Sequence, residues 1–456
     1  MGALQQYLDL YREHGDLINA RSCGALNALR RQAYDSLAKN PVLPRRGNEH
    51  YAVADVEEML APDYGLNLNR LHIDFSPAEA FRCEVPNMST ALFFLVNDAF
   101  ARTSNSYNGL PQGVVVESLA KAAKDYADIV DAHYGRVADM GNPIVALDTM
   151  LAQDGIFIYI PKGVRLEKPL QLVNILQNGM PLMAVRRILV VVEENASGQL
   201  LVCDHTQNPD ENFLALQTVE IVAGRNASFD IYDLEESTEK TTRLSALCVS
   251  QQEGSHVVVD GITLYNGNTR NEYYCNLLGE HAALELLGMG IEDCSRRIDT
   301  YSKIVHHVPN CKSNELFKYV ADDKALCGFE GLILVKEGAH GTSSYQTNRN
   351  LLGSQDARVY SRPQLEIYND DVKCSHGSAI GQLDETQLFY MRTRGVDEAD
   401  ARLLLKQAFM ADVIEGVRLG VLRDRLRMLV ERRFNGEHGS GCAVCSGCAD
   451  DTVVEE

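Results

Sequence analysis

The stretch Glu194-Asn195-Ala196-Ser197-Gly198-Gln199-Leu200-Leu201-Val202 shows the pattern that fills the middle of this 456-residue chain. A turn of Asn, Ser and Gly leads directly into a short strand of apolar and β-branched residues. The same unit returns as Arg225-Asn226-Ala227-Ser228-Phe229-Asp230-Ile231-Tyr232. Shorter versions of it follow at residues 254–259, 280–287, 322–325 and 354–357.

The spacing of these units indicates a solenoid. The small residue that closes each turn is Ala196, Ala227, Ser255, Ala282, Ala325 or Ala357. The first four are 31, 28 and 27 residues apart, and the last two are 32 apart. Repeats of this length bury their apolar faces by stacking on one another. We therefore predict a mainly β fold with a right-handed β-helix core over residues 146–383. The alternative is a β-sandwich, whose turns come every ~8–12 residues without a longer period.

The chain before this core has helical patterning. Apolar residues recur at three- and four-residue steps at Leu4, Tyr7, Leu8 and Tyr11, then at Leu26, Leu29, Ala33 and Leu37. The same spacing through Val116, Leu119, Ala122 and Ala123 predicts helix over residues 114–134. Residues 50–95 have a mixed pattern that predicts no element. We expect an N-terminal helical region over residues 1–145.

A second helical region is expected over residues 384–434. Asp384 with Gln387 resembles a capping box, and Gly395 is a typical helix stop. Asp397 is predicted to cap a further helix that runs to about Phe434. A cap on a solenoid needs only one apolar face, so surplus apolar surface here is a candidate docking surface, with self-packing as the alternative.

The candidate site is Val372-Lys373-Cys374-Ser375-His376-Gly377, which follows the turn at Asn369-Asp370-Asp371. In an extended segment, Cys374 and His376 point to the same face, roughly 7 Å apart at their Cα atoms. A thiolate and an imidazole at that spacing can share a metal ion or a sulfide-bridged iron if a second chain supplies further ligands. The alternative is that Val372, Cys374 and His376 form one inward, structural face.

Two further groups of metal-ligand type occur. Cys442, Cys445 and Cys448 form a C-x-x-C-x-x-C run in a tail, residues 435–456, that is predicted to be flexible. Three thiolates fall short of the usual four ligands, so His438 or a partner would have to complete a site; the alternative is a disordered, metal-scavenging or redox-labile segment. His306 and His307 are adjacent, so in a strand they face opposite ways, which predicts a structural role for both.

Composition and charge exclude several classes of function. The formal net charge of −20 argues against binding nucleic acid or an anionic membrane surface. No signal peptide or membrane-span pattern occurs, so the twelve cysteines are expected to be reduced thiols in a cytoplasmic protein. The sequence contains no phosphate-binding loop, nucleophile elbow, zinc-protease pair or dinucleotide fingerprint. We expect a protein that is not an enzyme.

Four segments carry a resemblance to a known family. They are Phe157 to Val164, Pro363 to Ile367, Asp370-Asp371-Val372-Lys373-Cys374-Ser375-His376-Gly377, and the run from Gly381-Gln382-Leu383-Asp384 to Gly395. With these segments, residues 145–434 resemble the SufB/SufD family of iron–sulfur cluster assembly proteins. The C-S-H-G sequence followed by G-Q-L-D is similar to the SufD branch.

The resemblance implies a β-helix scaffold that joins SufB and the SufC ATPase to build and transfer nascent iron–sulfur clusters. It implies that SufC docks on residues 384–434 and that His376 acts at the seam with SufB. Cys374 is then a second candidate ligand. No tightly bound cofactor is expected, only a transient cluster at the partner interface.

Two other functions remain open from the sequence. A homodimeric structural or binding protein would use the same open end of the solenoid for self-association. A carbohydrate-active β-helix enzyme would need carboxylates along a groove, for which Asp370 and Asp371 are the nearest candidates.

Overall fold

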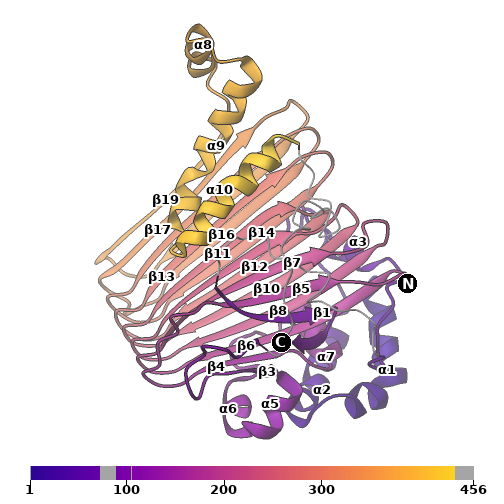
Figure 1. Ribbon diagram of the computed structural model, residues 1–456. Helices are drawn as coiled ribbons and strands as arrows, with labels where there is room; N and C mark the ends of the chain where they lie inside the picture. Colours follow the sequence, from indigo (N-terminus) through magenta and orange to yellow (C-terminus); the bar gives the residue numbers. More distant parts are fainter. Residues whose placement is uncertain (1, 72–88, 104, 437–456) are drawn as a thin grey trace.

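The computed structural model describes residues 2–71, 89–103 and 105–436, and its centre is a pair of facing parallel sheets. In the described residues one sheet has ten strands, in the order β19-β17-β15-β13-β11-β9-β7-β5-β1-β2. The other has nine, in the order β18-β16-β14-β12-β10-β8-β6-β4-β3. From β4 onward the chain therefore passes from one sheet to the other with each strand, and every strand from β4 to β17 pairs in parallel with the strand two places on. The predicted β-helix is confirmed, and the β-sandwich alternative is wrong (Figure 1).

The strands of the ten-stranded sheet are β1 (Ala91–Val96), β2 (Ala99–Arg102), β5 (Leu170–Leu176), β7 (Ser197–Thr206), β9 (Ser228–Glu236), β11 (His256–Tyr265), β13 (Ala283–Glu292), β15 (Lys312–Ala321), β17 (Thr342–Leu352) and β19 (Val372–Gln382). Those of the nine-stranded sheet are β3 (Val115–Ser118), β4 (Ile156–Ile160), β6 (Leu182–Val192), β8 (Phe213–Ala223), β10 (Thr241–Gln251), β12 (Asn268–Leu277), β14 (Arg297–His306), β16 (Leu326–Val335) and β18 (Arg358–Ile367).

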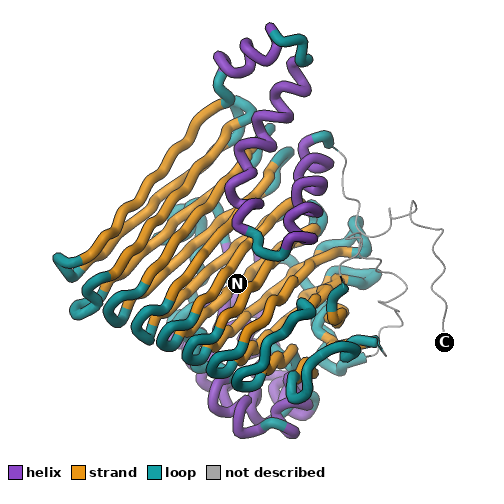
Figure 2. Tube along the Cα trace, turned by 60° about the vertical axis from the view of Figure 1, so that its left-hand side comes forward, coloured by secondary structure: helices purple, strands orange, loops and turns teal. Residues whose placement is uncertain are grey.

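The turns lie in two rows, one along each side of the solenoid (Figure 2). One row contains the successive turns closed by Ala196, Ala227, Ser255 and Ala282, and the opposite row contains those closed by Ala325 and Ala357. The turns that the sequence analysis treated as one series therefore belong to two separate rows. All six side chains are buried, because each turn folds its small residue inward. The residue before it adopts positive φ at Asn195, Asn226 and His281, a conformation that Asn tolerates better than most residues.

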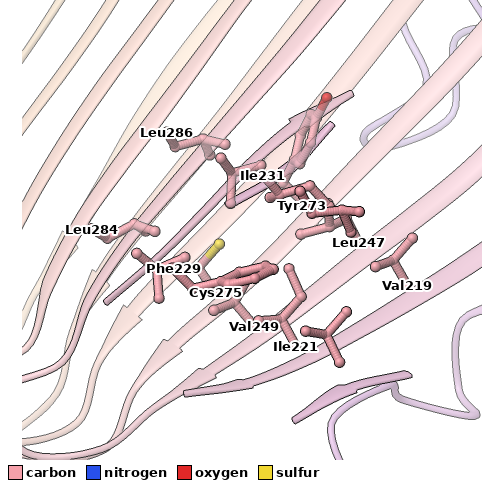
Figure 3. Close-up of a cluster of buried hydrophobic side chains, with 14 of the residues drawn as sticks. Val219, Ile221, Phe229, Ile231, Leu247, Val249, Tyr273, Cys275, Leu284 and Leu286 are labelled. Carbon is pink, nitrogen blue, oxygen red and sulfur yellow. The ribbon is translucent and has the colours of Figure 1, made fainter. Parts of the chain in front are cut away.

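The interior between the sheets of the early coils is apolar in one part, and in another part it holds buried ion pairs of Arg186 with Asp204 and of Arg243 with Asp233. Val219, Leu247 and Tyr273 are in register on β8, β10 and β12, and Ile231 and Leu286 face them from β9 and β13. Figure 3 shows these side chains gathered between the two sheets. Such columns of buried Val, Ile, Leu and aromatic residues hold the coils together, since apolar area is removed from water along the whole stack.

The N-terminal region differs in part from the prediction. Its helices are α1 (Ala3–Ala20), α2 (Gly24–Lys39), α3 (Val56–Leu60), α5 (Leu119–Asp125), α6 (Ala127–His133) and α7 (Pro143–Leu151). The predicted helix over residues 114–134 was wrong at its start, because Val115–Ser118 pairs with β4 as strand β3. Strands β1 and β2 also lie in this region, and α7 crosses the expected boundary at residue 145. The helices cover the outer face of β6, β8 and β10.

The C-terminal helices are α8 (Glu385–Thr393), α9 (Glu398–Gly416) and α10 (Gly420–Phe434). Asp384 and Asp397 cap α8 and α9 as predicted, by accepting from Gln387 N and Ala399 N respectively. The single helix expected up to Phe434 was wrong. The chain breaks at Val417, which is fully buried, and folds back so that α9 and α10 cover the outer face of β9, β11 and β13 together.

Candidate functional site

The solenoid ends in an open coil made of β18 and β19. Each is the last strand of its sheet, so one edge of each strand has no partner among the described residues. Most of their residues are exposed or only partly buried, in contrast to the buried strands that precede them. The open edges are a surface on which a further chain can pair or pack.

Cys374 and His376 lie on β19, as the sequence predicted, and on the same face of it. Cys374 is in register with Ser344 of β17, and His376 with Gln346. Ser344 and Gln346 are buried inside the solenoid, so both β19 residues stand on the inward side of the open coil. His376 is nevertheless exposed, because no further coil covers it. Val372, Cys374 and His376 thus share one inward face, as the alternative has it, and the imidazole on that face is exposed.

The Cys374 side chain is partly buried and packs against the edge of the apolar core. Burial raises the pKa of the Cys374 thiol, and a backbone contact with Ser344 offsets this only in part. The free thiol is thus protonated at neutral pH, and a bound metal ion would be needed to favour the thiolate. The pair can supply one soft sulfur donor and one imidazole donor.

Behind this pair, two columns of interior residues change from apolar to polar along the solenoid. The column that ends in Cys374 reads Phe229, Val257, Leu284, Ser313, Ser344, Cys374, one residue per coil. The column that ends in His376 reads Ile231, Val259, Leu286, Glu315, Gln346, His376. In both columns the last three residues carry polar or ionisable side chains. We name Ser313, Glu315, Ser344 and Gln346 the inner polar group.

The inner polar group is joined by hydrogen bonds. Gln346 Nε2 donates to Glu315 Oε2 at 2.7 Å, and the hydroxyls of Ser313 and Ser344 lie 2.5 Å apart. His306, on the facing strand β14, places Nε2 2.9 Å from the Ser313 hydroxyl. Burial raises the pKa of Glu315 to about 7 and lowers that of His306 to about 4. At neutral pH His306 is therefore neutral and Glu315 is close to its midpoint.

The sequence analysis missed the inner polar group, although a signal was present. Ser313-Asn314-Glu315 and Ser344-Tyr345-Gln346 have the same spacing as Cys374-Ser375-His376, and they precede it by 61 and 30 residues. These intervals are close to two repeats and one repeat of the solenoid. Polar residues at positions that should be buried, repeated at the coil period, indicate a specialised interior.

The other candidate residues lie apart from this pair. His306 points inward and His307 outward, as predicted, since His307 Nε2 contacts Asn276 Oδ1 at 2.9 Å on the outer face. Asp370 and Asp371 are exposed in the turn between β18 and β19. Cys442, Cys445, Cys448 and His438 lie outside the described residues. In the part of the chain that is described, no three His, Cys, Asp or Glu side chains gather as a metal site.

Ion pairs join the C-terminal helices to the outer face of the coils that contain β13 and β15. Lys318 Nζ of β15 lies 2.6 Å from Asp412 Oδ2, and Lys406 Nζ lies 2.7 Å from Asp322 Oδ2. Arg418 Nη2 lies 2.7 Å from Glu285 Oε1 of β13. Helix α8 projects beyond the last coil (Figure 1), and its Phe389 and Tyr390 are 67% and 58% exposed.

Comparison with known proteins gives the family of this fold. Residues 175–409 match the SUF system FeS cluster assembly, SufBD core domain, and residues 1–172 match the SufBD protein N-terminal region. The chain belongs to the SufBD family. The two matched segments together cover the N-terminal region, the described β-helix and α8, and end within α9.

Individual relatives agree with this membership. An iron–sulfur cluster assembly SufBD family protein of Synechocystis is 28% identical over 89% of this chain and 90% of its own length. The iron–sulfur cluster assembly protein SufD of Escherichia coli is 35% identical over 40% of this chain and 42% of its own length. SufD of Bacillus subtilis is 24% identical over 77% of this chain and 80% of its own length. The protein is thus a SufD-like member of a family that acts in iron–sulfur cluster assembly.

The described helices include none with the length and apolar character that crossing a membrane requires.

Proposed function

We propose that this SufBD family protein is a non-catalytic scaffold that pairs with SufB through its open coil, β18 and β19. Nascent iron–sulfur clusters would be built at that seam and transferred from it. His376 would be this chain's principal ligand or proton acceptor there, and Cys374 a second ligand. The cluster is cargo of the complex, so the seam would hold it transiently.

The observation that carries the proposal is the place of His376. It is exposed, on the last strand of its sheet, and next to unpaired strand edges. Two donors from one chain do not complete the coordination of an iron ion, which is usually four-coordinate in clusters. A second chain docked on the open coil would supply the remaining ligands and would exclude water from the site.

The C-terminal helices are proposed to dock the SufC ATPase. Phe389, Tyr390 and Leu404 are large apolar residues that are 67%, 58% and 47% exposed, which is typical of an interaction surface. The ion pairs of Lys318 and Lys406 join α9 to strand β15 and to the turn after it, two coils before β19. Movement of the helices on ATP binding would thus be passed to the seam through stacked coils, which deform little.

The site is tested in the purified complex with SufB and SufC. His376→Ala should abolish or strongly reduce cluster formation, followed by visible absorption after iron and sulfide are supplied. Ser375→Ala is the matched control, because Ser375 is exposed on the same strand but faces the other way. Equal cluster formation by wild type and His376→Ala would overturn the assignment of the site.

The docking of the ATPase is tested separately by co-purification. The double variant Phe389→Asp with Leu404→Asp should lose SufC while it retains SufB. Val42→Asp is the control, since Val42 is 66% exposed in the N-terminal region. Retention of SufC by the double variant would exclude this surface.

A further inference from the structure

A cavity of about 590 Å³ lies between the N-terminal region and the outer face of β12, β14 and β16. The solenoid contributes its outward side chains, and the opposite wall comes from two N-terminal segments, residues 44–51 and 137–145. This volume falls in the range of about 300–1,000 Å³ that is typical of small-molecule sites, which often form where two regions meet. Neither the candidate seam nor the C-terminal helices contribute to it.

The walls of the cavity are held in place by specific contacts. His50 Nδ1 lies 2.7 Å from Glu330 Oε1, and the His50 ring stacks on Tyr301 with centroids 4.3 Å apart. Tyr51 donates to Glu272 Oε1 at 2.8 Å. These contacts join residues more than 200 positions apart in sequence, so the cavity is a built feature of the fold rather than a gap between mobile parts.

Two lysines line the cavity, together with His307. Lys303 on β14 and Lys336 just after β16 are separated along the sheet by the paired residues Val305 and Leu334. In the described residues neither Lys303 nor Lys336 takes part in an ion pair, although the chain carries a net charge of −20; Lys303 is half-buried and Lys336 is exposed. Burial, and then the positive charge of Lys336, lower the pKa of His307. An anion in the cavity would therefore meet two lysines that make no ion pair with a carboxylate of the described residues.

Of the remaining charged groups that line the cavity, Arg270 is paired, and Asp139 is a carboxylate with no cationic partner among the described residues. Arg270 Nε lies 3.0 Å from Glu272 Oε1, and its Nη1 lies 3.4 Å from Asp299 Oδ1. Asp139 accepts a hydrogen bond from Gly141 N at 2.8 Å. Beside the two lysines the walls are apolar, formed by Val137, Val145, Val305 and Leu334. The cavity thus combines two lysines with an apolar wall, part of which lies between them.

We propose that this cavity binds a small organic anion, with its carboxylate or phosphate within reach of Lys303 or Lys336 and its apolar part against Val137 and against Val305 and Leu334, which lie between the two lysines. The site is independent of the proposed cluster seam. A second cavity, of about 610 Å³, shares Leu334 and Lys336 and continues to Glu366 and Tyr368 of the last coil. An occupied anion site would therefore lie beside the outer face of the coil that carries His376.

The test uses the full-length protein and two fluorescent probes of the same shape. One is 8-anilinonaphthalene-1-sulfonate, which is anionic, and the other is N-phenyl-1-naphthylamine, which is neutral. Lys303→Met with Lys336→Met should weaken saturable binding of the anionic probe at least about 10-fold, since each lysine offers a charge-assisted contact. Binding of the neutral probe should not change. Lys312→Met with Lys324→Met is the control pair, because both lysines are exposed elsewhere on the solenoid.

Two further experiments test whether the probes bind in this cavity and which anionic group the cavity prefers. Leu334→Trp should fill the cavity and exclude both probes while the circular dichroism spectrum and melting temperature of the protein stay near the wild-type values. Displacement of the anionic probe by benzoate or by phenyl phosphate would identify the preferred head group, and displacement by neither would overturn the proposal. Unchanged binding of the anionic probe by the double lysine variant, or equal loss of both probes, would also overturn it.

Discussion

The buried carboxyl of Glu315 should make the protein less stable as pH rises through neutrality. Glu315 is fully buried, and burial raises its pKa from an ordinary value of 4.5 to about 7. Between those two values the unfolded chain loses its proton and the folded chain keeps it. The free energy of unfolding therefore falls as pH increases across this window, and it levels off above about pH 7.

The size of the effect follows from the two pKa values. Between pH 5 and pH 8 the linkage relation gives a loss of about 2–3 kcal/mol from Glu315 alone. Glu315→Gln removes the titration but keeps an oxygen that can accept from Gln346 Nε2. The variant should thus lose about 2–3 kcal/mol less stability than wild type between the two pH values. Other buried acids, such as Asp260 and Glu292, titrate in both proteins and cancel in the comparison.

The measurement is urea unfolding at pH 5 and pH 8, followed by far-ultraviolet circular dichroism. Glu280→Gln is the matched control, because Glu280 is exposed in a turn of the same solenoid and should leave the pH dependence unchanged. The reasoning is refuted if Glu315→Gln and wild type lose the same amount of stability between the two pH values.

Two further predictions concern the solenoid itself. Arg187→Ala should lower the free energy of unfolding by about 3–5 kcal/mol, because it leaves the buried carboxylates of Asp148 and Glu220 without their cationic partner. If the urea midpoint of this variant shifts less than that of an ordinary surface variant, the prediction is contradicted. Gly279→Ala should destabilise the protein by about 1–3 kcal/mol or prevent soluble expression, since the added Cβ would lie 1.9 Å from the backbone of the neighbouring turn. Gly377→Ala is the control: its Cβ would meet nothing within 4 Å, so the melting temperature should not change.

The candidate pair and the repeat could be predicted because both depend on local pattern. The side-chain period of a strand is two, so the spacing of Cys374 and His376 alone placed them on one face. The turn sequences around Ala196, Ala227 and Ala282 repeat at the length of one coil, which fixed the solenoid. The caps at Asp384 and Asp397 were also local signals, and the structure places both as expected.

The errors arose where distant packing decides the outcome. Val115–Ser118 has helical spacing, but it becomes a strand because β4 offers it an unpaired edge. The helix expected to run from Asp397 to Phe434 breaks at Val417 because its apolar residues can only cover the sheet if the chain folds back. Local propensity is worth a few tenths of a kcal/mol per residue, and burial of an apolar side chain is worth about 1.5–3 kcal/mol.

The sequence by itself determined the β-helix, its helical flanks, and the two donor residues on its last strand, because each rests on a periodicity that short stretches carry. Only the tertiary structure decided that His376 is exposed, that the inner polar group lies behind it, and that a cavity lined by two lysines lies between the N-terminal region and the solenoid. Exposure and charge pairing depend on contacts between residues that are hundreds of positions apart in the sequence, and the spacing of residues within a short stretch does not determine those contacts.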